Sequence, residues 1–570
     1  MGRTVPMVTV RLHRCETPRD PRPSRSSKGL FVRQQQKQRR RTARLFGSLL
    51  LVAAAGVSAV GAAPSPGAGS AAATPLGQVV PAPASVVAGG PAYEITSKTR
   101  IRVERDSKEA QRVADYLAGV LRPSTGYRLP VTGQGGHDGI RLELSGKAKD
   151  LGDEGYRLVS GRGSLTITAH KAAGLFHGVQ TLRQQLPAEV EKGSRQTGPW
   201  LVAGGTIEDS PRYGYRGAML DVSRHFFGVD KVKRYIDELA LYKVNKLHLH
   251  LSDDQGWRIA VDSWPKLATY GGSTQVGGGQ GGYFTKAQYK EIVRYAASRY
   301  LEVIPEIDMP GHTNAALASY AELNCDGVAP PLYTGTNVGF SSLCVNKDRT
   351  YDFVDDVIRE LAAITPGKYL HIGGDEAHST SHEDYVTFMD KVQPIVAKYG
   401  KTVIGWHQLT GATPAKGALA QYWGLDGTSA AEKAQVAAAA QKGTGIVMSP
   451  ADRLYLDMKY NKDTPLGLAW AGYVEVQRSY DWNPGSYLPG VPASAVRGVE
   501  APLWSETLST SAQVEYMAFP RLPGVAELGW SPEATHDWDT YKVRLAAQAP
   551  RWDALGIGYY KSAQVPWPAG

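Results

Sequence analysis

From residue 213 onward the chain repeats one pattern: a short apolar run, a loop, and a stretch with the spacing of an amphipathic helix. The candidate strands are residues 217–222, 246–251, 301–307, 369–372, 402–406, 419–423, 445–448 and 496–504. Helical stretches such as 230–242, 285–299, 350–364, 383–399 and 430–441 lie between them. Eight such units over about 350 residues predict a (β/α)8 TIM barrel, because each strand-helix unit returns the chain to a parallel neighbour.

A doubly wound open sheet is the alternative fold for alternating strands and helices. That fold places a glycine-rich phosphate-binding turn after its first strand. Here the first strand leads into Asp221 and Arg224, and the glycine-rich run at residues 277–282 follows no strand. We interpret that run as a flexible loop, and the barrel is the favoured prediction for residues 211–570.

Residues 91–210 show a different pattern. The alternating runs at residues 101–103, 140–144, 156–159 and 165–168 are typical of half-buried strands, and 109–121 and 172–186 have helical spacing. This stretch predicts a small α+β domain before the barrel, with no cluster that suggests chemistry of its own.

The first 63 residues carry the net charge of the chain. They hold 13 of the 64 Lys and Arg and 2 of the 54 Asp and Glu, so the remainder has 51 basic and 52 acidic residues and a net charge of −1. The net charge of +10 for the whole chain therefore gives no reason to expect nucleic-acid binding.

The same residues have the features of an export signal. Basic residues 39–44 precede an apolar run, 45–60, which is short for a membrane span and is followed by small residues. We predict a leader over residues 1–63, a secreted mature protein and no membrane span after removal of the leader. Residues 64–90 are rich in Pro, Ala, Gly and Ser, which predicts a disordered linker.

Two cysteines remain outside the leader. Cys325 and Cys344 form an even pair in a chain that is predicted to be exported, which favours one disulfide. The alternative is two buried free thiols. Closing a loop of this length is worth roughly 3 kcal/mol in the chain-entropy model.

Polar and aromatic side chains gather at the predicted C-terminal ends of the strands, where barrel enzymes carry their chemistry. In strand order these residues are Asp221 and Arg224; His248, His250, Asp253 and Asp254; Glu306, Asp308 and His312; Asp375 and Glu376; Trp406; Tyr422 and Trp423; Tyr455 and Asp457; and Trp504 and Glu506. Indoles stack on the apolar faces of sugars, whereas hydroxyls need polar partners. The set therefore predicts a pocket for a neutral, hydroxylated ring.

The stretch from His371 to His378 is the most distinctive of these strand ends. Gly373 and Gly374 precede the carboxylates of Asp375 and Glu376. Two glycines remove side-chain bulk, which lets another molecule approach the backbone closely. Since consecutive strand residues point to opposite sides, we expect the two carboxylates to have different roles. The alternative interpretation is an acidic first turn of a helix.

Five segments of the chain resemble glycoside hydrolase family 20, and in particular its bacterial secreted β-N-acetylhexosaminidases. They are residues 220–225, 248–257, 306–312, 371–378 and 504–506, and the resemblance extends from about residue 90 to the C-terminus. The family's fold, a (β/α)8 barrel preceded by a small α+β domain, agrees with the pattern described above. The resemblance implies exo-acting, retaining release of terminal β-linked GlcNAc or GalNAc from oligosaccharides and glycans, without a cofactor or metal.

The mechanism that the resemblance implies is substrate-assisted, an exception to the usual pair of catalytic carboxylates. Glu376 would be the general acid and then the general base. Asp375 would orient the N–H of the sugar's 2-acetamido group, and Tyr455 would hydrogen-bond its oxygen. His312 would couple Asp253 to Glu376. The residues that would bind the sugar or support the site are Arg224, Asp308, Trp406, Trp423, Asp457, Trp470, Trp504 and Glu506.

Two other classes of function are open to the same sequence. His248 and His250 resemble the first metal ligands of metal-dependent amidohydrolases, but the later strand ends offer no further His or Lys ligands of that kind. A non-catalytic sugar-binding protein would keep the aromatic pocket, but it would gain nothing from the acidic pair of Asp375 and Glu376. The natural substrate stays open between chitin fragments, glycan ends and cell-wall debris, and the sequence gives no oligomeric state.

Overall fold

The structure is a computed structural model that describes residues 73–104, 106–133, 135–136 and 138–569. The predicted leader at residues 1–63 lies outside this range. Within it, no helix is both long enough and apolar enough to span a membrane.

The C-terminal part is a closed barrel of eight parallel strands that pair in chain order, and the last strand pairs with the first. The strands are β10 (Tyr215–Asp221), β11 (Lys246–His250), β14 (Glu302–Glu306), β15 (Tyr369–His371), β16 (Thr402–Trp406), β17 (Leu419–Tyr422), β18 (Gly445–Met448) and β19 (Val496–Ala501). Most of their residues are buried on both faces, as expected for parallel strands enclosed by helices. The predicted TIM barrel is confirmed.

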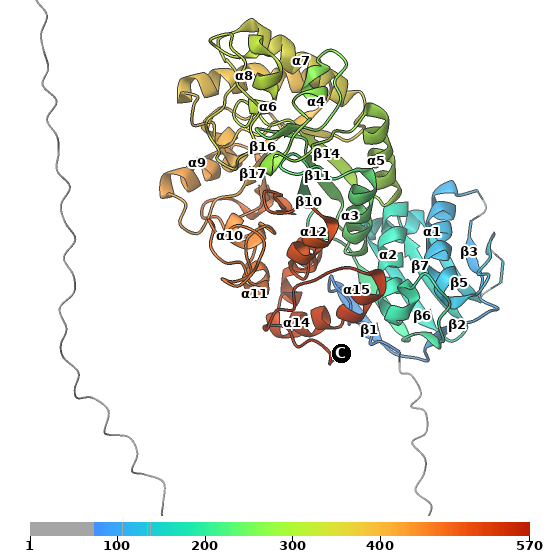
Figure 1. The fold of residues 1–570 in the computed structure, drawn as a ribbon. Coiled ribbons are helices and arrows are strands. Elements are labelled where there is room, and N and C mark those ends of the chain that lie inside the picture. Colours follow the sequence, from blue (N-terminus) through green and yellow to red (C-terminus); the bar gives the residue numbers. More distant parts are fainter. Residues whose placement is uncertain (1–72, 105, 134, 137, 570) are drawn as a thin grey trace, which may run out of the picture. The chain divides into compact units, whose positions relative to one another are not determined.

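Helices surround these strands (Figure 1). The longer ones are α3 (Val229–Leu241), α5 (Lys286–Ser298), α7 (Asp348–Ala362), α8 (His382–Lys398), α9 (Ala430–Gln441), α12 (Ser511–Ala518), α13 (Arg521–Trp530) and α14 (Trp538–Ala546). Shorter ones are α4 (Lys266–Thr269), α6 (Asn314–Ser319), α10 (Ala451–Leu454), α11 (Val476–Tyr480) and α15 (Ala549–Leu555). In α7 the buried residues Phe353, Val354, Val357, Ile358 and Leu361 recur at three- and four-residue spacing. This apolar stripe packs the helix against the barrel.

The N-terminal part is a mixed sheet of seven strands in the order β1-β9-β6-β7-β5-β3-β4. The strands are β1 (Ser85–Ala88), β3 (Ile101–Val103), β4 (Val131–Gly133), β5 (Gly139–Leu144), β6 (Tyr156–Gly161), β7 (Ser164–Ala169) and β9 (Gly205–Asp209). A separate ribbon pairs β2 (Tyr93–Ile95) with β8 (Trp200–Val202). Helices α1 (Lys108–Thr125) and α2 (Ala172–Gln185) pack together and against the sheet. The four strands and two helices predicted here are all present.

Helix α2 is buried along almost its whole length because it touches both the sheet and the barrel part. Phe176 lies against Tyr300 with ring centroids 5.1 Å apart, and His177 lies against Trp530 at 5.0 Å. The polar groups beside it form a set, buried except for the partly exposed Glu154, that we call the interdomain cluster: Glu154, Tyr156, His177, Asp209, Arg216, Lys243 and Trp530. Asp209 receives hydrogen bonds from the Tyr156 hydroxyl at 2.8 Å, Lys243 Nζ at 3.0 Å and Trp530 Nε1 at 2.9 Å.

The predicted linker over residues 64–90 is wrong for the part that the structure describes. Residues 85–88 form β1, which pairs antiparallel with β9, and Leu76, Val79 and Val80 are buried. Gln184 bonds both backbone groups of Val80, with distances of 2.9 and 2.6 Å. The Pro- and Ala-rich composition suggested disorder, but three apolar side chains and backbone pairing provide enough burial to order the segment. Residues 64–72 lie outside the described range.

Cys325 and Cys344 form the predicted disulfide, with their Cα atoms 4.9 Å apart. The loop that it closes packs on the loops after β11, β14 and β15. Ser341 Oγ accepts a hydrogen bond from Thr313 N at 2.9 Å, and the hydroxyls of Ser342 and Thr380 are 2.6 Å apart. The disulfide therefore anchors a loop that supports the C-terminal rim of the barrel.

Candidate active site

The predicted site residues lie in or after the C-terminal ends of the barrel strands, and contacts between their side chains join most of them into one connected group. Arg224 follows β10, Asp253 follows β11, and Asp308 and His312 follow β14. Asp375 and Glu376 follow β15, Trp406 ends β16, and Trp423 follows β17. Tyr455, Asp457 and Trp470 follow β18 and α10, and Trp504 and Glu506 follow β19.

The two glycines before the carboxylates have a different role from the predicted one. Gly373 and Gly374 have φ values of 66° and 100°, a conformation that favours glycine. A Cβ atom on Gly373 would lie 1.7 Å from Oδ1 of Asp308, and Gly374 N donates to the same oxygen at 3.1 Å. The glycines therefore make room for a side chain of this protein, so the expectation that they admit another molecule is wrong at Gly373.

The carboxylates of Asp375 and Glu376 do not point to opposite sides. β15 ends at His371, and Glu376 has a φ of 45°, so strand alternation no longer applies there. Nε2 of His312 lies 3.5 Å from Oδ2 of Asp375 and 3.4 Å from Oε2 of Glu376. One imidazole thus faces both carboxylates, so the expectation of two different roles cannot be based on strand alternation.

His312 links these carboxylates to the barrel interior. Its Nδ1 lies 3.3 Å from Oδ1 of Asp253, and Oδ2 of Asp253 lies 2.8 Å from Arg224 Nη2. Burial opposes the charge on His312, but Asp253 and Asp375 outweigh it and hold its pKa well above the usual value. Burial likewise opposes the charge on Asp253, yet Arg224 and His312 keep the pKa of that carboxyl well below its usual range. An imidazolium therefore lies beside Glu376.

Two buried carboxyl groups here have an oxygen without a partner. Oδ1 of Asp375 and Oδ2 of Asp308 have no hydrogen-bond partner among the described residues. Burial raises the pKa of Asp375 to about 6, and burial together with the charge of Asp375 raises the pKa of Asp308 well above its usual value. Buried acceptors are normally satisfied, so these open oxygens indicate a site for a ligand donor.

Aromatic side chains form one wall beside the carboxylates. Trp406 and Trp504 have ring centroids 5.8 Å apart, and Tyr455 lies 6.1 Å from Trp504. Trp470 lies 5.8 Å from Tyr455 and 6.0 Å from Trp423, and half of its surface is exposed. Burial, then the charge of Asp375, raise the pKa of Tyr455 well above its usual value, so its hydroxyl stays a hydrogen-bond donor.

Two of the remaining predicted residues, Arg224 and Asp457, contact Trp504. The guanidinium of Arg224 lies over that indole at 4.8 Å, and Asp457 accepts from its backbone N–H at 3.5 Å. Oδ2 of Asp457 and Nε of Arg224 lack partners among the described residues. Burial and the charge of Glu506 raise the pKa of Asp457 well above its usual value. These groups offer both donors and acceptors to the hydroxyls of a ligand.

The sequence analysis named Glu306, His250 and His371 at strand ends but gave them no role in the predicted sugar site, although the structure places them in the network. All three are fully buried, and Trp406 donates to Glu306 at 2.9 Å. The sequence did contain a sign of this role. Each of these ionisable residues stands at the end of an apolar strand, where a barrel buries its side chain. The prediction assigned them no role because their partners lie on other strands.

A parallel barrel that places a carboxyl acid beside an imidazolium, aromatic walls and partnerless carboxylates at its C-terminal rim has the features of a glycoside hydrolase. Residues 213–533 match the family described as "Glycosyl hydrolase family 20, catalytic domain", and residues 77–210 match "Glycosyl hydrolase family 20, domain 2". The chain belongs to glycosyl hydrolase family 20 and is an enzyme of the β-N-acetylhexosaminidase class, as the sequence predicts. The domain 2 match begins inside the stretch that was predicted to be a linker.

Relatives cover most of the chain. It is 42% identical over 495 residues to a β-N-acetylhexosaminidase of Cellulomonas fimi, covering 86% of this chain and 97% of that protein. The solved GH20 β-N-acetylhexosaminidase of Streptomyces coelicolor A3(2) is 76% identical, with a TM-score of 0.86 over 87% of this chain and 100% of that one. A mutant Streptomyces plicatus β-hexosaminidase in complex with its product GlcNAc is 77% identical, with a TM-score of 0.86 over 87% of this chain and 99% of that one.

Proposed function

We propose that this enzyme releases single terminal β-linked N-acetylhexosamines, with retention of configuration, through a cyclic oxazolinium intermediate formed by the sugar's own acetamido group. One observation carries the proposal: the Tyr455 hydroxyl and the open oxygen of Asp375 lie in an indole-lined part of the site. The acetamido group complements these features. Its C=O can accept a hydrogen bond from Tyr455, its N–H can donate to Asp375, and its apolar methyl can pack against the indoles.

Each step of the reaction has a group in place. Glu376 protonates the glycosidic oxygen while the acetamido oxygen attacks C1, so the C1–O bond to the leaving group breaks as the C1–O bond of the oxazolinium forms. Asp375 accepts a hydrogen bond from the acetamido N–H and stabilises the positive charge that develops on the oxazolinium ring. The carboxylate of Glu376 then takes a proton from water as the water attacks C1, which reopens the ring. Because the nucleophile belongs to the bound substrate, attack is intramolecular.

The surrounding residues hold the sugar for this attack. Arg224, Asp457 and Glu506 bind ring hydroxyls, while Trp406, Trp423 and Trp504 enclose the acetamido methyl and a face of the ring. Glu376 also borders a cavity of about 470 Å³ lined by residues that include His378, Gln408 and Trp423. This cavity has room for part of the leaving group.

A series of aryl substrates with acetamido, fluoroacetamido, difluoroacetamido and trifluoroacetamido groups tests the proposal. Fluorine withdraws electrons from the carbonyl oxygen, so kcat/KM falls steeply along the series if that oxygen is the nucleophile. The matching β-glucoside, which has no acetamido group, is expected to be almost inert. Equal rates along the series, or a glycosyl ester trapped on an Asp or Glu during turnover, would show ordinary double displacement.

We also propose that the enzyme is exported and acts on chitin fragments or glycan ends outside the cell. The predicted leader at residues 1–63 and the disulfide, which suits an oxidising compartment, support this proposal. Expression of the full chain in a bacterial host, with recovery of a shortened protein from the medium and sequencing of its N-terminus, tests it. Retention of the uncut chain inside the cells would count against export.

A further inference from the structure

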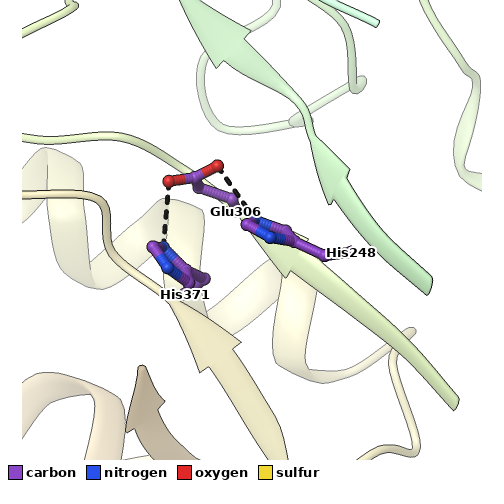
Figure 2. A group of neighbouring side chains, drawn as sticks. All are labelled: His248, Glu306 and His371. Atoms are coloured by element: carbon purple, nitrogen blue, oxygen red, sulfur yellow. Dashed lines mark hydrogen bonds and ion pairs between the residues drawn. The ribbon is translucent and has the colours of Figure 1, made fainter. Parts of the chain in front are cut away.

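Three imidazoles surround the carboxylate of Glu306 at the end of β14, as Figure 2 shows for His248 and His371. Oε1 of Glu306 lies 2.9 Å from Nδ1 of His371 and accepts from Trp406 Nε1 at 2.9 Å. Oε2 lies 2.9 Å from Nε2 of His248 and also bonds Nδ1 of His250. All five residues are fully buried.

A second carboxylate distinguishes two of these imidazoles from the third. Nδ1 of His248 lies 2.8 Å from Oε1 of Glu500, and Nε2 of His250 lies 2.7 Å from Oδ2 of Asp253. An ionised carboxylate only accepts hydrogen bonds, so an imidazole between two of them donates from both nitrogens and carries a positive charge. The carboxylates outweigh burial, which raises the pKa of His248 to about 9 and the pKa of His250 well above its usual value.

His371 lacks this second carboxylate. Its Nε2 has no hydrogen-bond partner among the described residues, and burial lowers its pKa despite the nearby Glu306. His371 is therefore the neutral imidazole of the three. Glu306 lies close enough to His248 and His371, and in a second group to His250 and Asp308, for a cation to be held. A cation needs nitrogen lone pairs, however, and in His248 and His250 both nitrogens carry hydrogens. The donor pattern therefore fits imidazolium.

The charged groups continue from the barrel interior to the catalytic acid. The order is Glu500, His248, Glu306, His250, Asp253, His312 and Glu376, in which anions and cations alternate. The groups that face His250 are Glu306, Asp253, the Arg224 guanidinium at 3.5 Å, the edge of the Trp504 ring at 4.9 Å and the carboxyl group of Asp308, which lies within 4.8 Å. Asp253 is thus balanced by His250 and Arg224 on one oxygen and by His312 on the other.

We propose that His250 is a positioning residue with a permanent positive charge, which ties Glu306 to Asp253 and thereby helps to set the alkaline limit of the activity. The proposal rests on the role of Glu376 as the acid. Without the charge on His250, Asp253 would be less well balanced, and the added negative potential would favour the protonated form of a nearby carboxyl group.

The test is the alkaline limb of the pH profile of kcat/KM, measured for an aryl N-acetylglucosaminide. His250→Gln removes the charge, and we expect the limb to move upward by about half a pH unit, which is less than the 1–3 units of a directly adjacent charge. The matched control is His371→Gln, which removes a neutral imidazole from the same carboxylate. It can reduce stability, but the limb stays in place. Equal shifts in both variants, or no shift in His250→Gln, would overturn the proposal.

Two further measurements keep the test decisive. Glu376→Gln comes first: if the limb disappears, it reports on Glu376, and if it persists, the acid assignment itself is wrong. The charge on His250 is then read directly in the wild-type full chain, by histidine-selective ¹⁵N NMR between pH 5 and 8. Protonated signals for both ring nitrogens throughout this range support the proposal even if His250→Gln does not fold. A neutral ring at pH 7 would disprove it.

Discussion

The interdomain cluster and the active-site rim are both buried groups of charges, but they differ in how completely those charges are paired. In the interdomain cluster Asp209 receives four hydrogen bonds, one of them from the backbone N–H of Ala84, and Glu154 bonds Arg216, His177 and Asn245. Burial opposes the charge on Glu154, yet Arg216 and His177 hold its pKa well below the usual range. At the rim, Asp308, Asp375 and Asp457 each keep one oxygen without a partner in the described part of the chain.

The difference separates a structural role from a catalytic one. Each charge in a cluster of paired ions stabilises its partners, so the loss of one member leaves a partner uncompensated. An unsaturated cluster is costly to the fold and becomes satisfied only when a ligand supplies the missing groups. Mutations in the interdomain cluster should therefore lower mainly the free energy of unfolding, whereas mutations at the rim should lower mainly the catalytic activity.

The largest effect is expected at the rim. Glu376→Gln removes the proton donor, and turnover of substrates with poor leaving groups should fall by about 10²–10⁴-fold, the usual share of general acid–base catalysis. Because Glu376 is only half-buried, the unfolding temperature should hardly change. Steady-state kinetics with an unactivated disaccharide, together with calorimetry, measure both quantities. Near-normal turnover would refute the assignment of the acid.

The reverse result is expected in the interdomain cluster. Asp209→Asn keeps the shape of the side chain but leaves Lys243 as an unpaired buried cation, which should lower the free energy of unfolding by about 3–5 kcal/mol. The kcat of the folded variant should stay close to that of the wild type. Urea unfolding and kinetics at low temperature separate the two effects. If the free energy of unfolding falls by less than 1 kcal/mol, the cluster contributes no more to stability than a surface ion pair does.

The raised pKa of Asp375 predicts how stability depends on pH. Because burial raises this pKa to about 6, the folded state binds more protons than the unfolded state between pH 4 and 6. The contribution of Asp375 to stability is therefore present below about pH 4 and is lost as the pH rises through 6, by about 2–3 kcal/mol. Asp375→Asn should abolish this part of the pH dependence.

The check is urea unfolding of both proteins at pH 4.5 and pH 7. Wild type should lose more stability than Asp375→Asn over this interval. Identical pH dependence in the two proteins would contradict the raised pKa. Binding of a stable oxazoline mimic whose N–H meets Asp375 should reduce the difference, because the mimic supplies the missing donor.

Only a small effect on stability is expected at Asp457. Asp457→Asn replaces a buried carboxyl group whose charged form is disfavoured by burial and by Glu506, so the free energy of unfolding should stay level or rise by up to about 1 kcal/mol. A hydrogen bond to a sugar hydroxyl is lost or weakened, and kcat/KM should fall by about 10–100-fold, in line with 1.5–3 kcal/mol for a bond to a charged group. A marked loss of stability would place Asp457 with the structural charges.

The sequence predicted the barrel closely because the features that define strands and helices are local. Most predicted strands agree with the observed ones to within a residue or two, including β16 and β18 without any difference. Apolar runs and helical spacing are read from neighbouring residues, and parallel pairing follows from the alternation of strands and helices. The residues of the candidate site could be named for the same reason, since strand ends of a barrel meet at one rim.

Residues 76–88 show where local composition misleads. Their Pro and Ala content is that of a linker, but β9 offers an unpaired edge and Gln184 bonds the backbone of Val80. The partners come from the far end of the domain, so no window of sequence contains them.

The sequence by itself determined the barrel, the residues at its rim and the family. Only the tertiary structure decided that Asp375 and Glu376 share one imidazole, that Gly373 makes room for Asp308, and which of three buried histidines are charged. The reason is physical. A strand or helix depends on residues a few positions apart, whereas the charge on His248 depends on Glu500, which is 252 positions away along the chain and 2.8 Å away in space.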